Sequence, residues 1–167
     1  MKYSRASVLL MLAIAPAFAG SRINPGTTEG VRPVINRAAI YCDQTHPKPI
    51  TQADIDAGGT TYTITTSDWY ALSTDLTGDI TITADNVKLV FNGYTLNGQL
   101  DIDANYVTVD MEGGKLYVSD KDGIKIEQGK HNIQIMNGIV GPVSSYHGIF
   151  VAGTTSGHCS NICIDCF

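Results

Sequence analysis

A direct repeat of 20 residues constrains the fold of this chain more than any other feature. Residues 78–97 and 98–117 align without a gap, so equivalent positions are 20 apart (98 − 78). Positions that are apolar in the first copy stay apolar in the second: Ile80/Leu100, Ile82/Ile102, Ala84/Ala104, Val87/Val107, Leu89/Val109, Phe91/Met111 and Leu96/Leu116. A period of about 20 to 50 residues is typical of solenoids, whose units bury their apolar faces only against their neighbours.

The pattern inside one copy indicates the kind of solenoid. Apolar residues alternate with polar ones at 80–82 and again at 87–91, which is the periodicity of β-strands. Asp, Asn and Gly interrupt the strands at 85–86, 92–93 and 97–98, and these residue types tolerate the positive φ of sharp corners. Short strands and corners that close a circuit in about 20 residues predict a parallel β-helix, with coils about 4.8 Å apart.

Two other folds explain the pattern less well. The run from Ala84 to Asn92 loosely fits a leucine-rich repeat, but Glu112 takes the asparagine position in the second copy. A β-sandwich also has alternating strands, but it does not require two units in the same phase. We therefore expect the apolar residues of both copies to point inward and to stack on partners 20 positions away: Ile80, Ile82, Val87, Leu89, Phe91, Leu100, Ile102, Val107, Val109 and Met111.

The chain begins with the three parts of a secretory signal peptide. Lys2 and Arg5 precede an apolar run over residues 8–15, and an A-x-A cleavage site ends at Ala19. The run is too short to span a membrane. We therefore assign residues 1–19 to a signal peptide and expect a secreted protein, found outside the cell, in the periplasm or at the cell surface.

Removal of this segment makes the chain more acidic. Cleavage after Ala19 takes away two positive charges, so the formal net charge changes from -5 to -7. An acidic chain argues against nucleic acid as a partner.

Residues 20–59 are expected to form a leader and an N-terminal cap. Thr51 with Asp54 resembles a capping box, and Ile50 can pack on Ile55 as a hydrophobic staple, which indicates a short helix. The same residues also suit an extended lead-in to the coils, so the sequence leaves both possibilities open.

The coils are assigned to residues 60–167. Thr61–Thr65 and Trp69–Leu76 are expected to be strands of a first, incomplete coil, with a turn between them. After Val118 the period lengthens while the strand pattern persists, and solenoids lengthen in this way because insertions fall in surface loops. The segment DGIKI at 122–126 resembles HGIFV 25 positions later (147 − 122), and NIQI at 132–135 resembles NICI 29 positions later (161 − 132).

These units resemble a known family. The D/H-G-I-x-I/V and N-I-x-I patterns, with the run VKLVFNGYTL at 87–96, are similar to secreted right-handed parallel β-helix proteins of the pectin-lyase-like superfamily, in its carbohydrate-binding and sugar-hydrolase domain group. The resemblance covers roughly residues 60–167 and implies an all-β, right-handed parallel β-helix. It says little about activity, because the repeat encodes the scaffold.

The last expected strand, Asn161–Phe167, has no polar capping segment after it. An open solenoid end exposes unpaired strand edges and normally needs a cap. We expect either a chain truncated at its C-terminus or end-to-end self-association.

Paired carboxylates occupy outward positions of the second copy. Asp101 and Asp103 are expected to lie on one face about 7 Å apart, and Asp110 and Glu112 form a similar pair on the next face. Such pairs can supply oxygen ligands to calcium, which makes Asp101 and Asp103 the candidate metal site. The alternative is that they are ordinary solvated surface acids.

The chain shows no catalytic constellation. The resemblance implies clustered aspartates with a basic residue in enzymes that cleave polyuronates, but the last arginine is Arg37, before the coils. A lysine with a depressed pKa could replace it, and the coils contain Lys88, Lys115 and Lys125, but nothing in the sequence indicates that these lysines are buried. The Gly-His-Gly pattern of polygalacturonases is absent, since Tyr146 precedes His147. We therefore name no catalytic residue. One alternative is the N-terminal part of a polysaccharide lyase or glycoside hydrolase whose active site lies beyond residue 167, and another is a purely structural exported repeat protein.

Three tyrosines are candidates for ligand binding. Tyr94, Tyr106 and Tyr117 lie at or near expected corners, where their rings could stack on sugar faces or simply pack at the corner. The sequence thus predicts a secreted β-helix scaffold that binds carbohydrate or another surface without catalysis, with polysaccharide as its partner.

The cysteines admit two interpretations. Cys159, Cys163 and Cys166 have the spacing of a radical-type iron–sulfur motif. The expected strand phase turns Cys163 outward and Cys166 inward, and a secreted chain favours disulfides over such clusters. Cys42 is a further candidate for a disulfide, with its partner left open.

Overall fold

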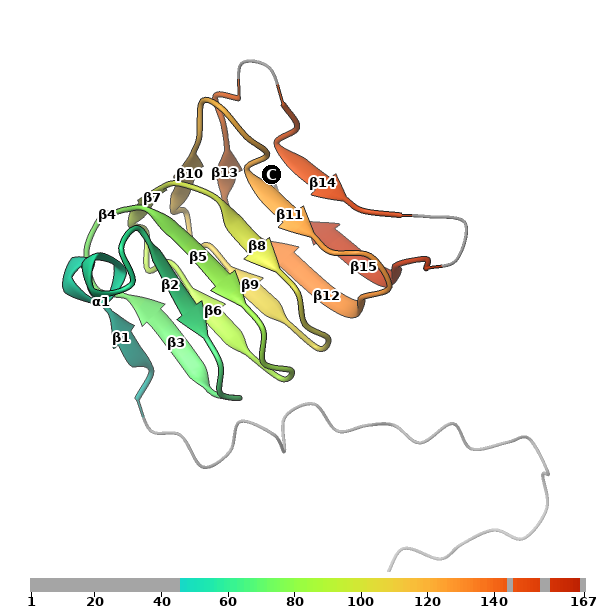
Figure 1. Ribbon diagram of the computed structural model, residues 1–167, viewed down its shortest axis with the longest axis horizontal. Coiled ribbons are helices and arrows are strands. Elements are labelled where there is room, and N and C mark those ends of the chain that lie inside the picture. The colour runs from blue at the N-terminus through green and yellow to red at the C-terminus, as the bar shows by residue number, and fades with distance from the viewer. Residues whose placement is uncertain (1–45, 144–145, 154–156, 166–167) are drawn as a thin grey trace, which may run out of the picture. The chain divides into compact units, whose positions relative to one another are not determined.

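The computed structural model describes residues 46–143, 146–153 and 157–165. The predicted signal peptide and most of the leader therefore lie outside the described residues. The described part is almost entirely β-structure, with every strand pair parallel. It is the parallel β-solenoid that the 20-residue repeat predicts (Figure 1).

Each complete coil contributes one strand to each of three sheets in turn, while β1 and the pair β14 and β15 belong to incomplete coils at the two ends of the described stack. Sheet A contains, in spatial order, β1 (Lys48–Ile50), β3 (Trp69–Leu72), β6 (Lys88–Val90), β9 (Thr108–Asp110), β12 (His131–Met136) and β15 (Ser160–Asp165). Sheet B contains β2 (Thr61–Ile64), β5 (Asp79–Ile82), β8 (Leu100–Ile102), β11 (Ile124–Ile126) and β14 (Ile149–Val151). Sheet C contains β4 (Leu76–Thr77), β7 (Thr95–Asn97), β10 (Lys115–Tyr117) and β13 (Ile139–Val140).

The register confirms the repeat and its later lengthening. Ile80 pairs with Leu100 and Leu96 with Leu116, each 20 positions apart as predicted. Ile124 pairs with Ile149, which is the predicted offset of 25, and Ile133 pairs with Ile162, which is the predicted offset of 29. Sequence self-similarity therefore identifies the stacking partners even where the loops between them differ in length.

The predicted core is also confirmed. All ten residues expected to point inward have no exposed surface: Ile80, Ile82, Val87, Leu89, Phe91, Leu100, Ile102, Val107, Val109 and Met111. Phe91 is the largest fully buried side chain of the described residues. They belong to one continuous apolar cluster that fills the inside of the coils.

A short helix, α1 (Gln52–Ala57), covers the first end of the stack and contacts β2 and β4 (Figure 1). The Thr51 side chain accepts a hydrogen bond from the Asp54 backbone, and the Asp54 carboxylate accepts one from the Thr51 backbone at 2.8 Å. Ile50 and Ile55 are both fully buried. The structure thus decides for the capped helix over the extended lead-in.

The predicted single strand from Trp69 to Leu76 is wrong. β3 ends at Leu72 and β4 begins at Leu76, with an exposed corner between them. Asp75 fixes this corner, because its carboxylate accepts a hydrogen bond of 2.8 Å from the Thr95 backbone in the next coil. The first coil is therefore complete, with a strand in each sheet.

The corners require their turn residues for two different physical reasons. Asn86 and Asn92 have positive φ values of 58° and 52°, as predicted. The corner at Asn97-Gly98 has no positive φ, so the predicted reason for its glycine is wrong. Gly98 is required instead because a Cβ atom there would overlap the carbonyl oxygen of Gly78 in the preceding coil.

Candidate ligand-binding groove

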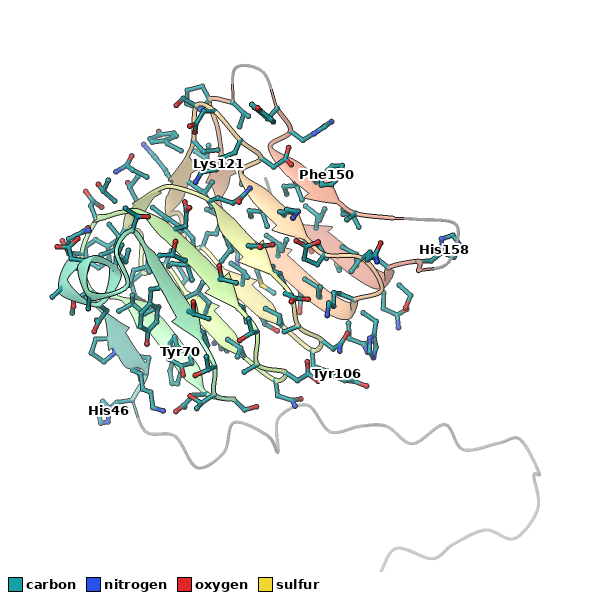
Figure 2. The ribbon with its side chains drawn as sticks, viewed as in Figure 1. His46, Tyr70, Tyr106, Lys121, Phe150 and His158 are labelled. Atoms are coloured by element: carbon teal, nitrogen blue, oxygen red, sulfur yellow. The ribbon has the colours of Figure 1, made fainter. Side chains whose placement is uncertain are left out.

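A groove of about 700 Å³ follows the corner at which sheet C leads into sheet B. It crosses successive coils, with Gly78 and Gly98 at the corners of the first two and the segment from Tyr117 to Lys121 at the third. Figure 2 shows Lys121 at this corner, beside the strands β10 and β11. The remaining lining residues are Thr60, Thr77, Asp79, Asn97 and Pro142.

A local insertion creates the groove. Asn97 pairs with Tyr117 at an offset of 20 (117 − 97), but Leu100 pairs with Ile124 at an offset of 24 (124 − 100). The third coil therefore carries four additional residues at a corner that the previous coil turns with Gly98 and Gln99. These residues line the groove beside the two glycine corners, where side chains are absent.

The fold itself excludes side chains from the two glycine corners. Gly78 has φ of 129°, and a Cβ atom there would overlap Ile55 and the Thr60 carbonyl oxygen. Gly98 is equally crowded against Gly78. Both glycines are thus dictated by the stacking of the coils, and an open concave surface is the consequence.

One ion pair connects the inserted segment to the corner at Gly78, two coils earlier. Lys121 donates to one carboxylate oxygen of Asp79 at 2.6 Å, across 42 positions of sequence. The other carboxylate oxygen of Asp79 accepts a hydrogen bond of 2.8 Å from the Gln99 backbone. Both charges are therefore satisfied within the groove, and the pair holds its position.

Other polar groups of the groove are free to bind a ligand. The Asp120 carboxylate is exposed and has no ion pair or hydrogen bond among the described residues. The Tyr117 ring is half-buried, and its hydroxyl group has no partner in the described part of the chain. Asn97 is exposed beside them at the end of β7; its amide nitrogen donates to the Leu76 carbonyl at 3.5 Å, and its amide oxygen has no partner among the described residues. An aromatic face therefore lies next to unsatisfied hydrogen-bonding groups.

The three candidate tyrosines lie at three different corners. Tyr117 ends β10 in the groove, Tyr94 lies where sheet A leads into sheet C, and Tyr106 lies where sheet B leads into sheet A. Figure 2 shows Tyr106 and Lys121 at separate corners. The predicted corner positions are confirmed, but the three rings do not converge. Of the three tyrosines, only Tyr117 lines the groove.

Tyr106 occupies an unusual backbone conformation. Its φ is 56°, in the left-handed region that Asn86 occupies one coil earlier. Its ring meets His131 edge-on, with ring centroids 5.1 Å apart. A left-handed tyrosine is uncommon, and this aromatic contact helps to hold it in place.

The candidate metal site is flanked by lysines. Asp103 pairs with Lys130 at 2.7 Å, and Asp101 lies between Thr81 and Lys125 on sheet B. Burial raises the pKa of the Asp101 carboxyl, while Lys125 opposes this rise and Glu127 adds to it. One buried oxygen of Asp101 has no hydrogen-bond partner. These side chains therefore form a charged patch that contains both carboxylates and lysines.

Calcium would need more oxygen ligands than this patch presents, because it takes six to eight. Within the residues that the structure describes, no group of three or more His, Cys, Asp and Glu side chains is arranged to hold a metal ion. In the second predicted pair, the Asp110 carboxylate accepts a hydrogen bond of 3.0 Å from Asn137. Calcium binding at Asp101 and Asp103 stays a prediction.

Two of the four cysteines are described, and both are free thiols. Cys159 is partly buried, with its sulfur 3.2 Å from the Glu127 carbonyl oxygen and 3.3 Å from that of Ala152. Cys163 points outward from β15 and is exposed, as the strand phase predicts. Cys42 and Cys166 lie outside the described residues.

Most of the groove was missed by reasoning from the sequence. Tyr117 was a candidate, but Asp79, Asp120 and Lys121 were not. The available signal was the change of period after Val118, because an insertion at a corner must protrude from the stack. The residues that the insertion approaches depend on three-dimensional stacking and could not be identified in that way.

Comparison with known proteins adds no assignment. No protein-family model matches the chain. No curated protein matches it. No solved structure matches it either. Among the described residues, no helix has the length and apolar character needed to cross a membrane.

Proposed function

We propose that the chain is a secreted, non-catalytic scaffold that binds carbohydrate in the groove between sheets C and B, built on the plan of pectin-lyase-like β-helix proteins. The observation that supports this function is the Tyr117 ring beside unsatisfied polar groups in a groove of about 700 Å³. Ligand sites typically combine a concave surface of this size with an aromatic wall and a few convergent polar groups.

The chemistry of the groove suits a sugar. A pyranose ring offers an apolar C–H face and a rim of hydroxyl groups. The Tyr117 ring can cover the face, while the Asp120 carboxylate and the Asn97 side chain can bond to the hydroxyl groups.

The scaffold favours binding without large rearrangement. The groove lies on paired strands of three coils, and Lys121 is fixed to Asp79 by the 2.6 Å ion pair. A surface that is ordered before binding loses little conformational entropy when a ligand arrives. This arrangement is consistent with a rigid receptor for an extended glycan.

Tyr117→Ala tests the site. Calorimetric titration with a panel of oligosaccharides should detect binding to the wild-type protein and at least a tenfold loss of affinity in this variant. Tyr94→Ala is the matched control, because Tyr94 is an exposed tyrosine at a different corner. Equal losses in both variants, or no loss in Tyr117→Ala, would place the binding elsewhere.

The non-catalytic part of the proposal has its own test. Incubation with pectate or polygalacturonate, with and without calcium, should yield no unsaturated products that absorb in the ultraviolet. If calcium binds, its titration should change in the double variant Asp101→Ala/Asp103→Ala. An unchanged titration would remove these residues as the metal site.

We also propose that copies of the chain associate through the surface formed by β13, β14 and β15. Among the described strands each lies at the edge of its sheet, and apolar side chains are exposed there: Ile139, Val151 and Ile164. A second copy would pair the free strand edges and cover these side chains. Light scattering should show oligomers that Ile164→Lys weakens and Tyr94→Lys does not. A stable wild-type monomer at high concentration would contradict this.

A further inference from the structure

We propose that the groove selects glycans with free amino groups, such as glucosamine oligomers, over neutral glycans and polyuronates. This inference rests on the proposed carbohydrate-binding function and adds the chemical class of the ligand. It follows from which charges of the groove are already paired and which are not.

The groove contains three charged side chains, namely Asp79, Asp120 and Lys121. Asp79 and Lys121 neutralise each other at 2.6 Å. Asp120 is the remaining charge, and it is exposed without a partner in the described part of the chain. The groove therefore presents one uncompensated negative charge to a ligand.

A polyuronate fits this arrangement poorly. Its carboxylates would face Asp120, and like charges repel at close range. Lys121 can still donate to a ligand carboxylate with its other N–H groups, but Asp79 already offsets its charge at 2.6 Å. The pair is neutral as a whole, so it attracts an anion less than a free cation would.

The neighbouring charges do not compensate Asp120 either. Asp122 is occupied, because its carboxylate accepts hydrogen bonds of 3.0 Å from both the backbone and the ring of His147. This pair belongs to the next part of the inserted corner and is not among the lining residues of the groove. A ligand amine beside Asp120 would thus gain an attraction that a neutral group would not.

The expected preference is modest because Asp120 is exposed. An exposed ion pair contributes about 0.2 to 1 kcal/mol, which corresponds to a change in affinity of roughly 1.4- to fivefold. Three oligosaccharides of equal length isolate the effect: a glucosamine oligomer, its N-acetylated form and an oligomer of galacturonic acid. The glucosamine oligomer should bind tightest, and the galacturonic acid oligomer weakest.

Asp120→Asn is the decisive variant. It should remove the preference for the amine over the N-acetylated oligomer, and high salt should do the same in the wild type. Glu112→Gln is the matched control, since it removes one exposed negative charge outside the groove. It should leave the preference intact.

The outcomes separate the two proposals. Equal binding of the amine and N-acetylated oligomers to the wild type, with sensitivity to Tyr117→Ala, would overturn the charge selection and leave carbohydrate binding in place. Tightest binding of the galacturonic acid oligomer would do the same. Absence of binding by all three oligomers would overturn both proposals.

Discussion

The regular coils, residues 78–117, and the lengthened coils, residues 118–165, share one strand pattern but differ in burial. Leu100 and Ile102 in β8 are fully buried, whereas Val151 in β14 is 39% exposed and Ile164 in β15 is 46% exposed. All of these residues occupy equivalent inward positions in their registers. Within the lengthened coils Ile126 and Ile135 are still fully buried, so the same alternation of apolar residues gives a sealed core as far as β12 and an open one at β14 and β15.

The difference shows what a solenoid repeat determines. Alternation fixes which way a side chain points, but burial depends on the coils on both sides. β8 pairs with β5 and β11, whereas β14 pairs only with β11 among the described strands. Stability should thus be concentrated in the regular coils. The inserted corners of the lengthened coils expose polar groups that can bind a ligand.

The largest expected effect is the difference in unfolding free energy between the alanine variants of two phenylalanines. Phe91 is fully buried in the regular coils, so Phe91→Ala should cost about 3 to 5 kcal/mol of unfolding free energy. Phe150 lies on the outer side of β14 and is only partly buried, so Phe150→Ala should cost about 1 kcal/mol or less. Urea unfolding measures both. Equal costs would mean that the buried inward position of Phe91 contributes no more to stability than the partly buried outer position of Phe150.

A second pair of variants concerns backbone crowding. Gly98→Ala would drive a Cβ atom into the Gly78 carbonyl, and the shift needed to relieve the overlap should cost about 1 to 3 kcal/mol. Gly153→Ala meets no atom within 4 Å, and its backbone does not need positive φ. That variant should be neutral or slightly stabilising. Thermal unfolding distinguishes them, and a tolerated Gly98→Ala would contradict the crowding.

Much of the fold was predictable because the signal is local and repeated. Ile80 and Leu100 could be paired from the sequence alone, since the copies align without a gap. The division of Trp69–Leu76 into two strands could not, because the corner depends on a hydrogen bond from the next coil to Asp75. Repeats therefore reveal stacking partners better than they reveal corners.

The candidate site was less predictable for the same reason. Tyr117 was identifiable as a corner aromatic, but its relevance depends on the groove that the insertion after Val118 forms. The ion pair between Asp79 and Lys121 joins residues 42 positions apart across different coils. No pattern within one coil encodes that contact.

The capped first end of the stack offers a smaller test. Thr51→Ala removes the oxygen that accepts from Asp54, and loss of such an N-cap typically costs about 1 kcal/mol. Thr63→Ala is the control, because Thr63 is exposed on the outer side of β2. It should change stability by no more than about 0.5 kcal/mol. Chemical unfolding that gives equal effects would show that α1 does not stabilise this end.

The smallest expected effects concern two carboxylates, whose ionised forms should change the stability of the fold with opposite signs in the two regions. Burial raises the pKa of the Asp101 carboxyl in β8, so its ionised form destabilises the fold once the pH exceeds the folded-state pKa. The backbone hydrogen bond from His147 lowers the pKa of Asp122 at the lengthened corner. Its ionised form therefore stabilises the fold above the unfolded-state pKa of about 3.9.

Replacing each carboxylate by its amide should expose this contrast. At pH 7, Asp101→Asn should raise the unfolding free energy and Asp122→Asn should lower it. The Asp101 effect should shrink as the pH falls below its raised pKa and vanish below the unfolded-state pKa, whereas the Asp122 effect should shrink below the unfolded-state pKa and vanish as the pH falls through its lowered pKa. Urea unfolding between pH 7 and pH 3 measures both. If both substitutions destabilise equally at pH 7, burial at Asp101 is outweighed by the attraction of Lys125, and the outer face of the regular coils is no less suited to charge than the lengthened corner.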